Sequence, residues 1–420
     1  MPRVFTVGPL PGKSLKWLES KGAEVVVYNK NHAPKPTKAE LEQVFGSEMV
    51  KIYGVDRLSK EVMLGNASAI TKEDFCNVLK EDYQVIIPWL TTPIDVECVK
   101  KANPNLRLFA SYSAGLDHLP FNVASEAGIL SAHTRSVLHF GVAEHTMALI
   151  LCLVRSFNYQ DYFFRKRLWK GKWHAEFFDY GNRSDLYNRT LGIAGFGQIG
   201  KEVYKRAKAF NMRILAYDPF MNKAAIAHYP DVRFIENLDE LFKESDIVSL
   251  HMPYIAPGKP GSTHEIVGKK QLELLGKEGY LINTARGRIV NEKELVAALK
   301  NNVIAGAGLD VFYNEPFAET ELYDMRLNTV LTPHTASVGS SREDGQVSDF
   351  DDLVSDVGKL RKNFDNGEIL LGMSSLTVMN AYLALKGLEP LSMVHGVDFN
   401  KTLEARKKLG KPDYKEDLLA

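Results

Sequence analysis

The fold is decided by residues 191–200, LGIAGFGQIG, in which an apolar run leads into three spaced glycines and a helical pattern follows. The first glycine permits a tight turn, the second lets the backbone approach a pyrophosphate, and the third allows close contact between helix and strand. Free N–H groups at the start of the helix attract the same anion. The stretch predicts a dinucleotide site with these cofactor-binding residues: Gly195, Gly197, Gln198, Ile199 and Gly200.

A carboxylate supports the same interpretation. The next predicted strand, 213–217, is followed directly by Asp218. Asp218 comes 18 residues after Gly200, close to the spacing of about 20 residues at which an acidic residue reaches the adenosine ribose. A 2′-phosphate would meet like charge there, so NAD is favoured over NADP as the cofactor. The alternative is that Asp218 only begins an Asp-Pro turn with Pro219.

The rest of the chain alternates short β-rich runs with helical patterns, which predicts an α/β fold. Six strands separated by helices indicate a doubly wound parallel sheet. These strands are 191–194, 213–217, 247–250, 280–283, 305–310 and 330–332. We expect two Rossmann-like domains with a cleft between them. The expected boundaries are 1–139 and 339–372 for a discontinuous substrate domain, 140–338 for the dinucleotide domain, and 373–420 for a peripheral C-terminal extension.

Composition and charge exclude several classes of protein. The 420 residues are 45% hydrophobic and 25% charged, as in an ordinary globular chain. Lys and Arg (52) balance Asp and Glu (52), so the electrostatic signature of a nucleic-acid binder is missing and the substrate should be small. The longest strictly apolar run, Met147–Val154, is far shorter than the about 20 residues of a membrane span. We interpret residues 142–154 as a buried linking helix and expect no membrane partner.

The cysteines bear on the cellular compartment. Cys76, Cys98 and Cys152 form neither a C-x-x-C motif nor an even-numbered set, which indicates no zinc module and no oxidising compartment. The N-terminus has no charged segment leading into an apolar one. We therefore expect a cytoplasmic protein without a resident metal.

One aromatic and basic patch, residues 162–180, has two interpretations. Its eight aromatic and five basic side chains could stack on and neutralise nucleic acid. They could also pack a helix and an arm against a partner subunit, with Lys and Arg stems lying over apolar surface. We favour the second interpretation, which predicts a homodimer and no nucleic-acid partner.

Three predicted strands end in polar residues that carry chemistry. The segments are Asn283-Thr284-Ala285-Arg286-Gly287, Asp310 followed by Glu315, and Thr332-Pro333-His334. Carboxyl ends of parallel strands border the ligand crevice in doubly wound folds. Taken singly, Arg286 could cap a helix, Glu315 could be a solvated charge, and His334 could be a satisfied loop histidine. Their joint position at strand ends favours a catalytic set.

These ordered motifs resemble the D-isomer-specific 2-hydroxyacid dehydrogenase family over residues 106–339, and residues 142–145 resemble the start of that family's interdomain helix. The resemblance implies Arg286, Glu315 and His334 as the catalytic arginine, the catalytic acid and the acid/base histidine. It implies NAD-dependent interconversion of a D-2-hydroxy acid and its 2-oxo acid. Further cofactor contacts would fall on Thr284, Ala285 and Asp310.

The chemistry requires the same residue types. A guanidinium binds a substrate carboxylate with two parallel bonds and polarises the C2 oxygen, which suits Arg286. A histidine that titrates near neutrality can move a proton to or from that oxygen, which suits His334. A carboxylate at the far ring nitrogen fixes the tautomer and raises the pKa of the histidine, which suits Glu315. The family's formate dehydrogenases carry Gln at that position, so formate is disfavoured as the substrate.

A loop in the N-terminal region is expected to bind the substrate carboxylate. Ser113, Ala114 and Gly115 resemble the family's Gly-rich loop, in which backbone N–H groups hold this carboxylate and small residues allow close approach. The loop carries no Arg or Lys, which disfavours a phosphorylated substrate. His133 or Arg135 on the next loop could reverse that inference if either one faces the substrate.

Two features leave alternatives open. Residues 255–262 form an insert where relatives have a short turn, and its Pro and Gly residues predict a protruding loop that borders the cofactor or a neighbour. The family also includes transcriptional corepressors, so the alternative function is a non-enzymatic, NAD-sensing scaffold. Retention of all three catalytic residue types argues against that alternative.

Overall fold

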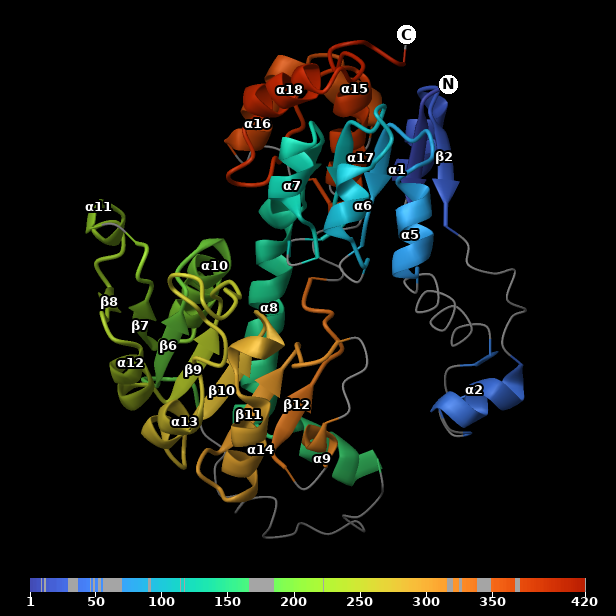
Figure 1. The fold of residues 1–420 in the computed structure, drawn as a ribbon. Helices are drawn as coiled ribbons and strands as arrows, with labels where there is room; N and C mark the ends of the chain where they lie inside the picture. The colour runs from blue at the N-terminus through green and yellow to red at the C-terminus, as the bar shows by residue number, and fades with distance from the viewer. Residues whose placement is uncertain are drawn as a thin grey trace. The chain divides into compact units, whose positions relative to one another are not determined.

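A computed structural model places most of the chain in two compact units (Figure 1). Unit 1 comprises Met1–Leu138 and Gly339–Ala420, and unit 2 comprises His139–Val338. The structure describes residues 1–8, 10, 13–28, 37–45, 47, 50–51, 54–55, 70–89, 92–113, 115–116, 118–165, 185–221, 223–315, 320–324, 327–337, 349–366 and 371–419. The predicted arm at 166–180 and the predicted substrate-loop residue Ala114 lie outside the described residues.

Unit 1 is built on a parallel sheet with the order β2-β1-β3-β4-β5, which is one of the strand orders of doubly wound folds. Its strands are β1 (Arg3–Thr6), β2 (Glu24–Val27), β3 (Val85–Ile87), β4 (Leu108–Ala110) and β5 (Leu130–Ala132). Its helices include α1 (Ser14–Ser20), α2 (Lys38–Phe45), α5 (Lys72–Val78), α6 (Val96–Lys100) and α7 (Phe121–Glu126). Phe75 and Ala124 pack on one face of the sheet, and Leu18 and Val378 pack on the other.

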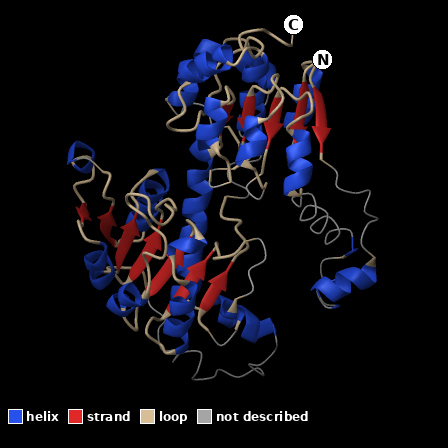
Figure 2. Ribbon diagram, in the orientation of Figure 1, coloured by secondary structure: helices blue, strands red, loops and turns tan. Residues whose placement is uncertain are grey.

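Unit 2 contains a second parallel sheet, whose strands are among the red arrows in Figure 2. Its strand order is β12-β11-β10-β9-β6-β7-β8, with the labels in Figure 1. Its strands are β6 (Thr190–Ala194), β7 (Arg213–Tyr217), β8 (Val232–Phe234), β9 (Ile247–Leu250), β10 (Tyr280–Asn283), β11 (Gly306–Leu309) and β12 (Thr329–Leu331). All six predicted strands are present, and β8 is added at one edge. The direction of strand succession reverses between β6 and β9, where doubly wound sheets bind their ligands.

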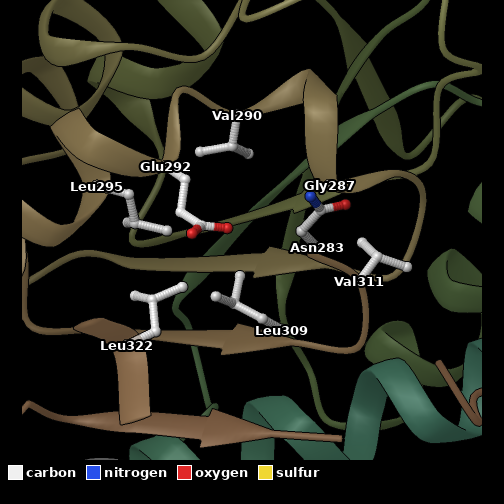
Figure 3. Close-up of a pocket in the computed structure, with 8 residues that line it drawn as sticks. All are labelled: Asn283, Gly287, Val290, Glu292, Leu295, Leu309, Val311 and Leu322. Carbon is white, nitrogen blue, oxygen red and sulfur yellow. The ribbon is translucent and has the colours of Figure 1, made fainter. Parts of the chain in front are cut away.

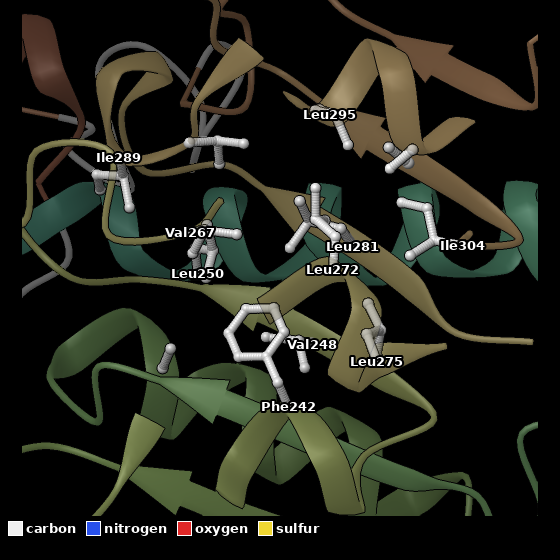
Figure 4. Packing of buried hydrophobic residues seen from close by; sticks show 14 of the residues in the cluster. Phe242, Val248, Leu250, Val267, Leu272, Leu275, Leu281, Ile289, Leu295 and Ile304 are labelled. Atoms are coloured by element: carbon white, nitrogen blue, oxygen red, sulfur yellow. The ribbon is translucent and has the colours of Figure 1, made fainter. Parts of the chain in front are cut away.

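Helices cover both faces of this second sheet. They are α10 (Gln198–Ala209), α11 (Lys223–Ile226), α12 (Leu238–Glu244), α13 (Lys269–Leu275) and α14 (Glu292–Lys300), with short 3-10 turns η2 (Gly287–Ile289) and η3 (Glu321–Tyr323). Phe242, Leu272 and Leu295 lie with sheet residues in one buried cluster (Figure 4). Burial on both faces explains why strands such as β9 and β10 read as almost continuous apolar runs.

The linking helix, α8 (Arg135–Val154), is longer than the predicted 142–154. Among the described residues it alone has the length and apolar composition of a membrane span, over Val137–Val154. Of that window, 56% is buried inside the protein. Its Leu149 and Leu153 lie against Gly308 of the central sheet, where a side chain on the glycine would meet them at 3.1 and 3.2 Å. The helix α8 is thus a core helix of unit 2 beyond its first turn.

The C-terminal region is not the peripheral extension that its polar composition predicts. Its helices are α15 (Phe350–Val354), α16 (Val357–Asp365), α17 (Met373–Leu385) and α18 (Phe399–Lys408). The helix α17 is apolar on nearly every side and packs inside unit 1, as such helices do. Arg406 of α18 is only 2% exposed and donates to the backbone carbonyls of Pro104, Leu106, Gly128 and Pro412. The prediction was wrong because it was based on the polar residues at the end of the chain. It did not take into account the apolar helix α17 or the buried hydrogen bonds of Arg406.

The inference drawn from the cysteines also needs correction. Cys76 on α5 and Cys98 on α6 form a disulfide with a Cα–Cα distance of 5.3 Å, and Cys152 is free. An odd number of cysteines means only that at least one of them stays unpaired within the chain. The packing of α5 beside α6 brings Cys76 and Cys98 together. The cysteine count therefore no longer supports a reducing compartment, and cytoplasmic location stays a prediction.

Candidate active site

The glycine turn has the geometry of a phosphate cradle. Gly195 has φ +97°, and a Cβ on it would lie 2.7 Å from the backbone of His251 and Met252, just after β9. A Cβ on Gly200 would lie 2.3 Å from the Gly195 carbonyl oxygen. At Gly197, the N-cap of α10, a Cβ would meet nothing within 4 Å, so the space before the helix is open. The first backbone hydrogen bond of α10 runs from the N–H of Lys201 to the carbonyl of Gly197. The N–H groups that precede Lys201 include those of the predicted contacts Gln198 and Ile199, and they are suited to bind a pyrophosphate.

Asp218 stands beside this turn. Its Oδ2 accepts the N–H of Phe196 at 2.9 Å, and its Oδ1 accepts the N–H of Phe220 at 3.0 Å. These bonds hold the carboxylate next to the glycine turn while each oxygen keeps a lone pair for a further donor. The two acceptor oxygens therefore fit the hydroxyl groups of the adenosine ribose of a dinucleotide.

The loop after β10 places Arg286. The side chain of Asn283 accepts the N–H of Ala285 at 3.0 Å and donates to the Arg286 carbonyl at 2.9 Å, which folds the loop back on itself. A Cβ on Gly287 would lie 1.9 Å from the Phe312 carbonyl oxygen, so only glycine lets this loop approach the one after β11. The hydroxyl of Thr284 is buried and lies 3.0 Å from that of Thr146 on α8, within the protein rather than toward open space.

His334 and Glu315 form a hydrogen-bonded pair. Nδ1 of His334 lies 2.5 Å from Oε2 of Glu315, and the other carboxylate oxygen accepts the Phe312 N–H at 2.8 Å. Burial raises the pKa of Glu315. This effect is outweighed by the hydrogen bond and charge of His334, the hydrogen bond from the Phe312 N–H and the charge of Arg286, so the pKa of Glu315 is lowered. Glu315 is therefore ionised at neutral pH, and the predicted catalytic residues lie together at the carboxyl edge of one sheet.

A buried network holds the turn that carries His334. Asp310 is fully buried, and its oxygens accept the Thr332 hydroxyl at 2.6 Å and the N–H groups of Thr335 at 2.8 Å and Ala336 at 2.9 Å. Its carbonyl accepts the N–H of His334, whose φ is +54°, a conformation uncommon outside glycine. We predicted Asp310 as a cofactor contact, but its described contacts make it a positioning residue for His334.

Sequence reasoning assigned no role to two residues of this network, Thr332 and His145. Nε2 of His145 on α8 lies 2.8 Å from the Thr332 hydroxyl and 3.6 Å from Asp310. Since the one hydroxyl proton of Thr332 goes to Asp310, His145 must donate to Thr332. The one sequence pattern that includes His145 is the motif at residues 142–145. That motif does not predict a hydrogen bond to Thr332, which lies far along the chain.

The predicted substrate loop lies in unit 1, after β4. The Ser113 hydroxyl donates to the Gly115 carbonyl at 2.8 Å and lies 2.8 Å from the hydroxyl of Ser111. Ser111 in turn lies 3.2 Å from Nε2 of His118. Ser113 therefore shapes the loop with its side chain, and the role of the loop in substrate binding stays a prediction.

A small pocket lies behind the Arg286 loop, where the side chains of Asn283 and Glu292 meet an apolar wall (Figure 3). The volume open to the centre of a water molecule is about 10 Å³, which admits roughly one water and no organic substrate. Among the described ranges, no group of three or more His, Cys, Asp or Glu side chains could hold a metal ion.

Comparisons with known proteins agree on one family. Residues 147–336 match the model of the D-isomer specific 2-hydroxyacid dehydrogenase NAD binding domain. The chain is 35% identical over 309 residues to glyoxylate reductase of Pyrococcus horikoshii, covering 72% of this chain and 89% of the relative. It is 33% identical over 306 residues to D-3-phosphoglycerate dehydrogenase of Methanocaldococcus jannaschii, covering 71% of this chain and 55% of that one.

Solved structures share the fold. A protein of Thermus thermophilus has a TM-score of 0.66 and 31% identity, covering 93% of this chain and 99% of that one. The NADPH-dependent glyoxylate/hydroxypyruvate reductase of Sinorhizobium meliloti has a TM-score of 0.65 and 24% identity, covering 95% and 99%.

Proposed function

Because the chain belongs to the D-isomer-specific 2-hydroxyacid dehydrogenase family, we propose that it interconverts a small D-2-hydroxy acid and its 2-oxo acid with NAD. The observation that carries the proposal is the bond between His334 and Glu315, with Arg286 close enough to lower the pKa of the carboxyl. This arrangement can bind a carboxylate and move a proton beside it. It has no evident use in a protein that only senses NAD.

The roles follow from the hydrogen bonds. Ionised Glu315 only accepts, so the proton on its His334 partner sits on Nδ1 and leaves Nε2 to exchange a proton with the C2 oxygen. Arg286 binds the substrate carboxylate and polarises that oxygen. When bound beside these residues, the nicotinamide would supply or take up the hydride at C2. The N–H groups at the start of α10 would hold the pyrophosphate, and the Asp218 carboxylate would accept hydrogen bonds from the ribose hydroxyls.

Asp218 supports NAD as the preferred form of the cofactor. A 2′-phosphate at this position would stand beside a carboxylate that two backbone N–H groups already hold in place. The cost of like charges in contact favours the dinucleotide without that phosphate. NADPH is therefore the control cofactor in the turnover assay.

The test is oxidation of NADH against glyoxylate, pyruvate, hydroxypyruvate and phenylpyruvate. We expect turnover with at least one of the first three, which have small side chains, and loss of turnover in His334→Ala. Tight binding of NADH without turnover of any 2-oxo acid would instead favour the NAD-sensing scaffold.

We also propose a homodimer built on α9 (Phe157–Arg165) of unit 2. This helix exposes an unusual amount of aromatic surface: Phe157 is 53%, Tyr162 43% and Phe164 61% exposed. Exposed apolar patches mark protein interfaces, and aromatic side chains are enriched at such interfaces. The zero net charge of the chain does not favour nucleic acid as the partner. Light scattering after size exclusion should give twice the chain mass, and Phe164→Lys should shift the mass toward one chain.

A further inference from the structure

The insert at 255–262 forms a closed loop after β9. The N–H of Ile255 donates to the Thr263 hydroxyl at 2.7 Å, and the N–H of Thr263 donates to the Ile255 carbonyl at 3.0 Å. The Thr263 hydroxyl also donates to the Pro253 carbonyl at 2.7 Å. Since the base of the loop is bonded in both directions, the insert is a defined structure and not a loose excursion of the chain.

The insert contacts the turn that carries Asp218. Phe220, two residues beyond that carboxylate, is 76% exposed although it is a large apolar side chain. A Cβ built on Gly261 of the insert would lie 3.5 Å from Cζ of Phe220 and 4.0 Å from Cδ1 of Ile255. The backbone of Gly261 therefore lies next to the tip of the Phe220 ring, and most of the ring is exposed.

This contact lies at the edge of the sheet where the cofactor site is. The backbone of His251 and Met252, at the start of the loop that carries the insert, abuts Gly195 in the glycine turn. The N–H of Phe220 is bonded to Asp218 itself. The β7 turn and the β9 loop thus flank the strand-order reversal between β6 and β9, where dinucleotides bind.

We propose that Phe220, supported at its tip by the insert, is the stacking surface for the adenine ring of the cofactor. Single exposed apolar side chains are common. This one is aromatic, follows the ribose-binding carboxylate by two residues, donates its N–H to that carboxylate and lies next to Gly261 of the insert. Aromatic faces stack on nucleobases without reading their edges. The inference rests on dinucleotide binding by unit 2 and is independent of which 2-oxo acid the enzyme uses.

Titration of three ligands separates the two halves of the cofactor. We expect Phe220→Ala to weaken binding of NADH and of ADP-ribose about tenfold, since one stacked base contributes this much or more. Nicotinamide mononucleotide should bind Phe220→Ala as it binds the wild type. Phe220→Trp should retain affinity for ADP-ribose. Phe210→Ala removes another exposed aromatic side chain of the same unit and is the control for the loss of exposed aromatic surface in general. Unchanged affinity of Phe220→Ala for ADP-ribose would overturn the proposal.

Two glycines of the insert test its supporting role. Gly261 and Gly258 have φ of +72° and +78°, so alanine strains the backbone alike at both positions. Only at Gly261 does the added methyl meet Phe220, because a Cβ at Gly258 has no atom within 4 Å. We expect Gly261→Ala to change the dissociation constant of ADP-ribose several-fold relative to Gly258→Ala. Equal constants for these two variants would exclude the insert from the adenine site.

Discussion

Nδ1 of His334 and Oε2 of Glu315 lie 2.5 Å apart, and the remaining oxygen of that carboxylate accepts the N–H of Phe312. The imidazole is therefore oriented by a carboxylate that is itself held by the backbone. The strained φ of +54° at His334 is maintained by the carbonyl of Asp310, which accepts its N–H. Orientation and proton location at His334 thus follow from residues on two neighbouring strand ends.

Replacement of the pair should lower the rate of the chemical step. We expect His334→Ala to reduce kcat by about 10² to 10⁴, the usual contribution of general acid/base catalysis. Glu315→Gln should reduce kcat less, because an amide can still bond Nδ1 but does not stabilise imidazolium. Steady-state kinetics with saturating NADH gives the values. His228→Ala, at an exposed histidine of the same unit, serves as the control, and a His334→Ala enzyme with normal kcat would remove His334 from the mechanism.

The same pair should make stability depend on acid pH. The folded-state pKa of Glu315 is lowered from 4.5, so its pairing stabilises the fold fully above about pH 4.5 and is lost as pH falls through the folded-state value. The difference in free energy of unfolding between wild type and Glu315→Gln should shrink as the pH falls below about 4.5. Urea unfolding from about pH 3 to about pH 7 measures it. A difference that grew on acidification would contradict the assigned bond.

The network behind His334 should matter without touching substrate. Thr332→Val removes the hydroxyl that links His145 to Asp310. Because small displacements of a catalytic group are costly, we expect kcat to fall about ten- to a hundredfold while the dissociation constant of NADH stays unchanged. Thr332→Ser, which keeps the hydroxyl, should restore most of the rate. If both variants behave alike, the bond to Asp310 has no role in placing His334.

Asp218 should determine which nicotinamide cofactor is used. Asp218→Ser removes the charge that opposes a 2′-phosphate, so the ratio of kcat/KM with NADH to that with NADPH should fall at least about tenfold. Its shorter hydroxyl also weakens the bonds to Phe196 and Phe220. Part of the change should therefore appear as weaker NADH binding. An unaltered ratio would assign cofactor choice to another residue.

Arg406 should be a stability residue of unit 1. Arg406→Met leaves several buried backbone carbonyls without donors, at about 1 to 3 kcal/mol each, so we expect a loss of about 3 kcal/mol or more in the free energy of unfolding. Arg155→Met is the matched control, since Arg155 pairs with the exposed Asp185 and such pairs contribute less than about 1 kcal/mol. Comparable losses in the two variants would mean that the C-terminal region is not anchored through Arg406.

Much of the site could be predicted because its signals are local. The glycine turn, Asp218 and the polar residue at each strand end all depend on the short-range alternation of strand, turn and helix, and parallel strands bring their carboxyl ends to one edge. The role of Asp310 could not be predicted in this way. A carboxylate at the end of a strand can face a ligand or accept N–H groups from the next turn, and tertiary packing decides between the two. In this protein packing buries Asp310, which accepts the N–H of Thr335.

By itself, the amino-acid sequence determined the α/β class, the dinucleotide turn and the residue types of the catalytic set, because periodicity and motif spacing act over a few neighbouring residues. The tertiary structure alone decided which distant groups meet. It paired Cys76 with Cys98, placed the C-terminal helix α17 in the core of unit 1, joined His145 to Thr332, and set Gly261 next to the tip of the Phe220 ring. Each of these contacts joins elements that are separate along the chain, and only the packing of helices on the two sheets brings them together.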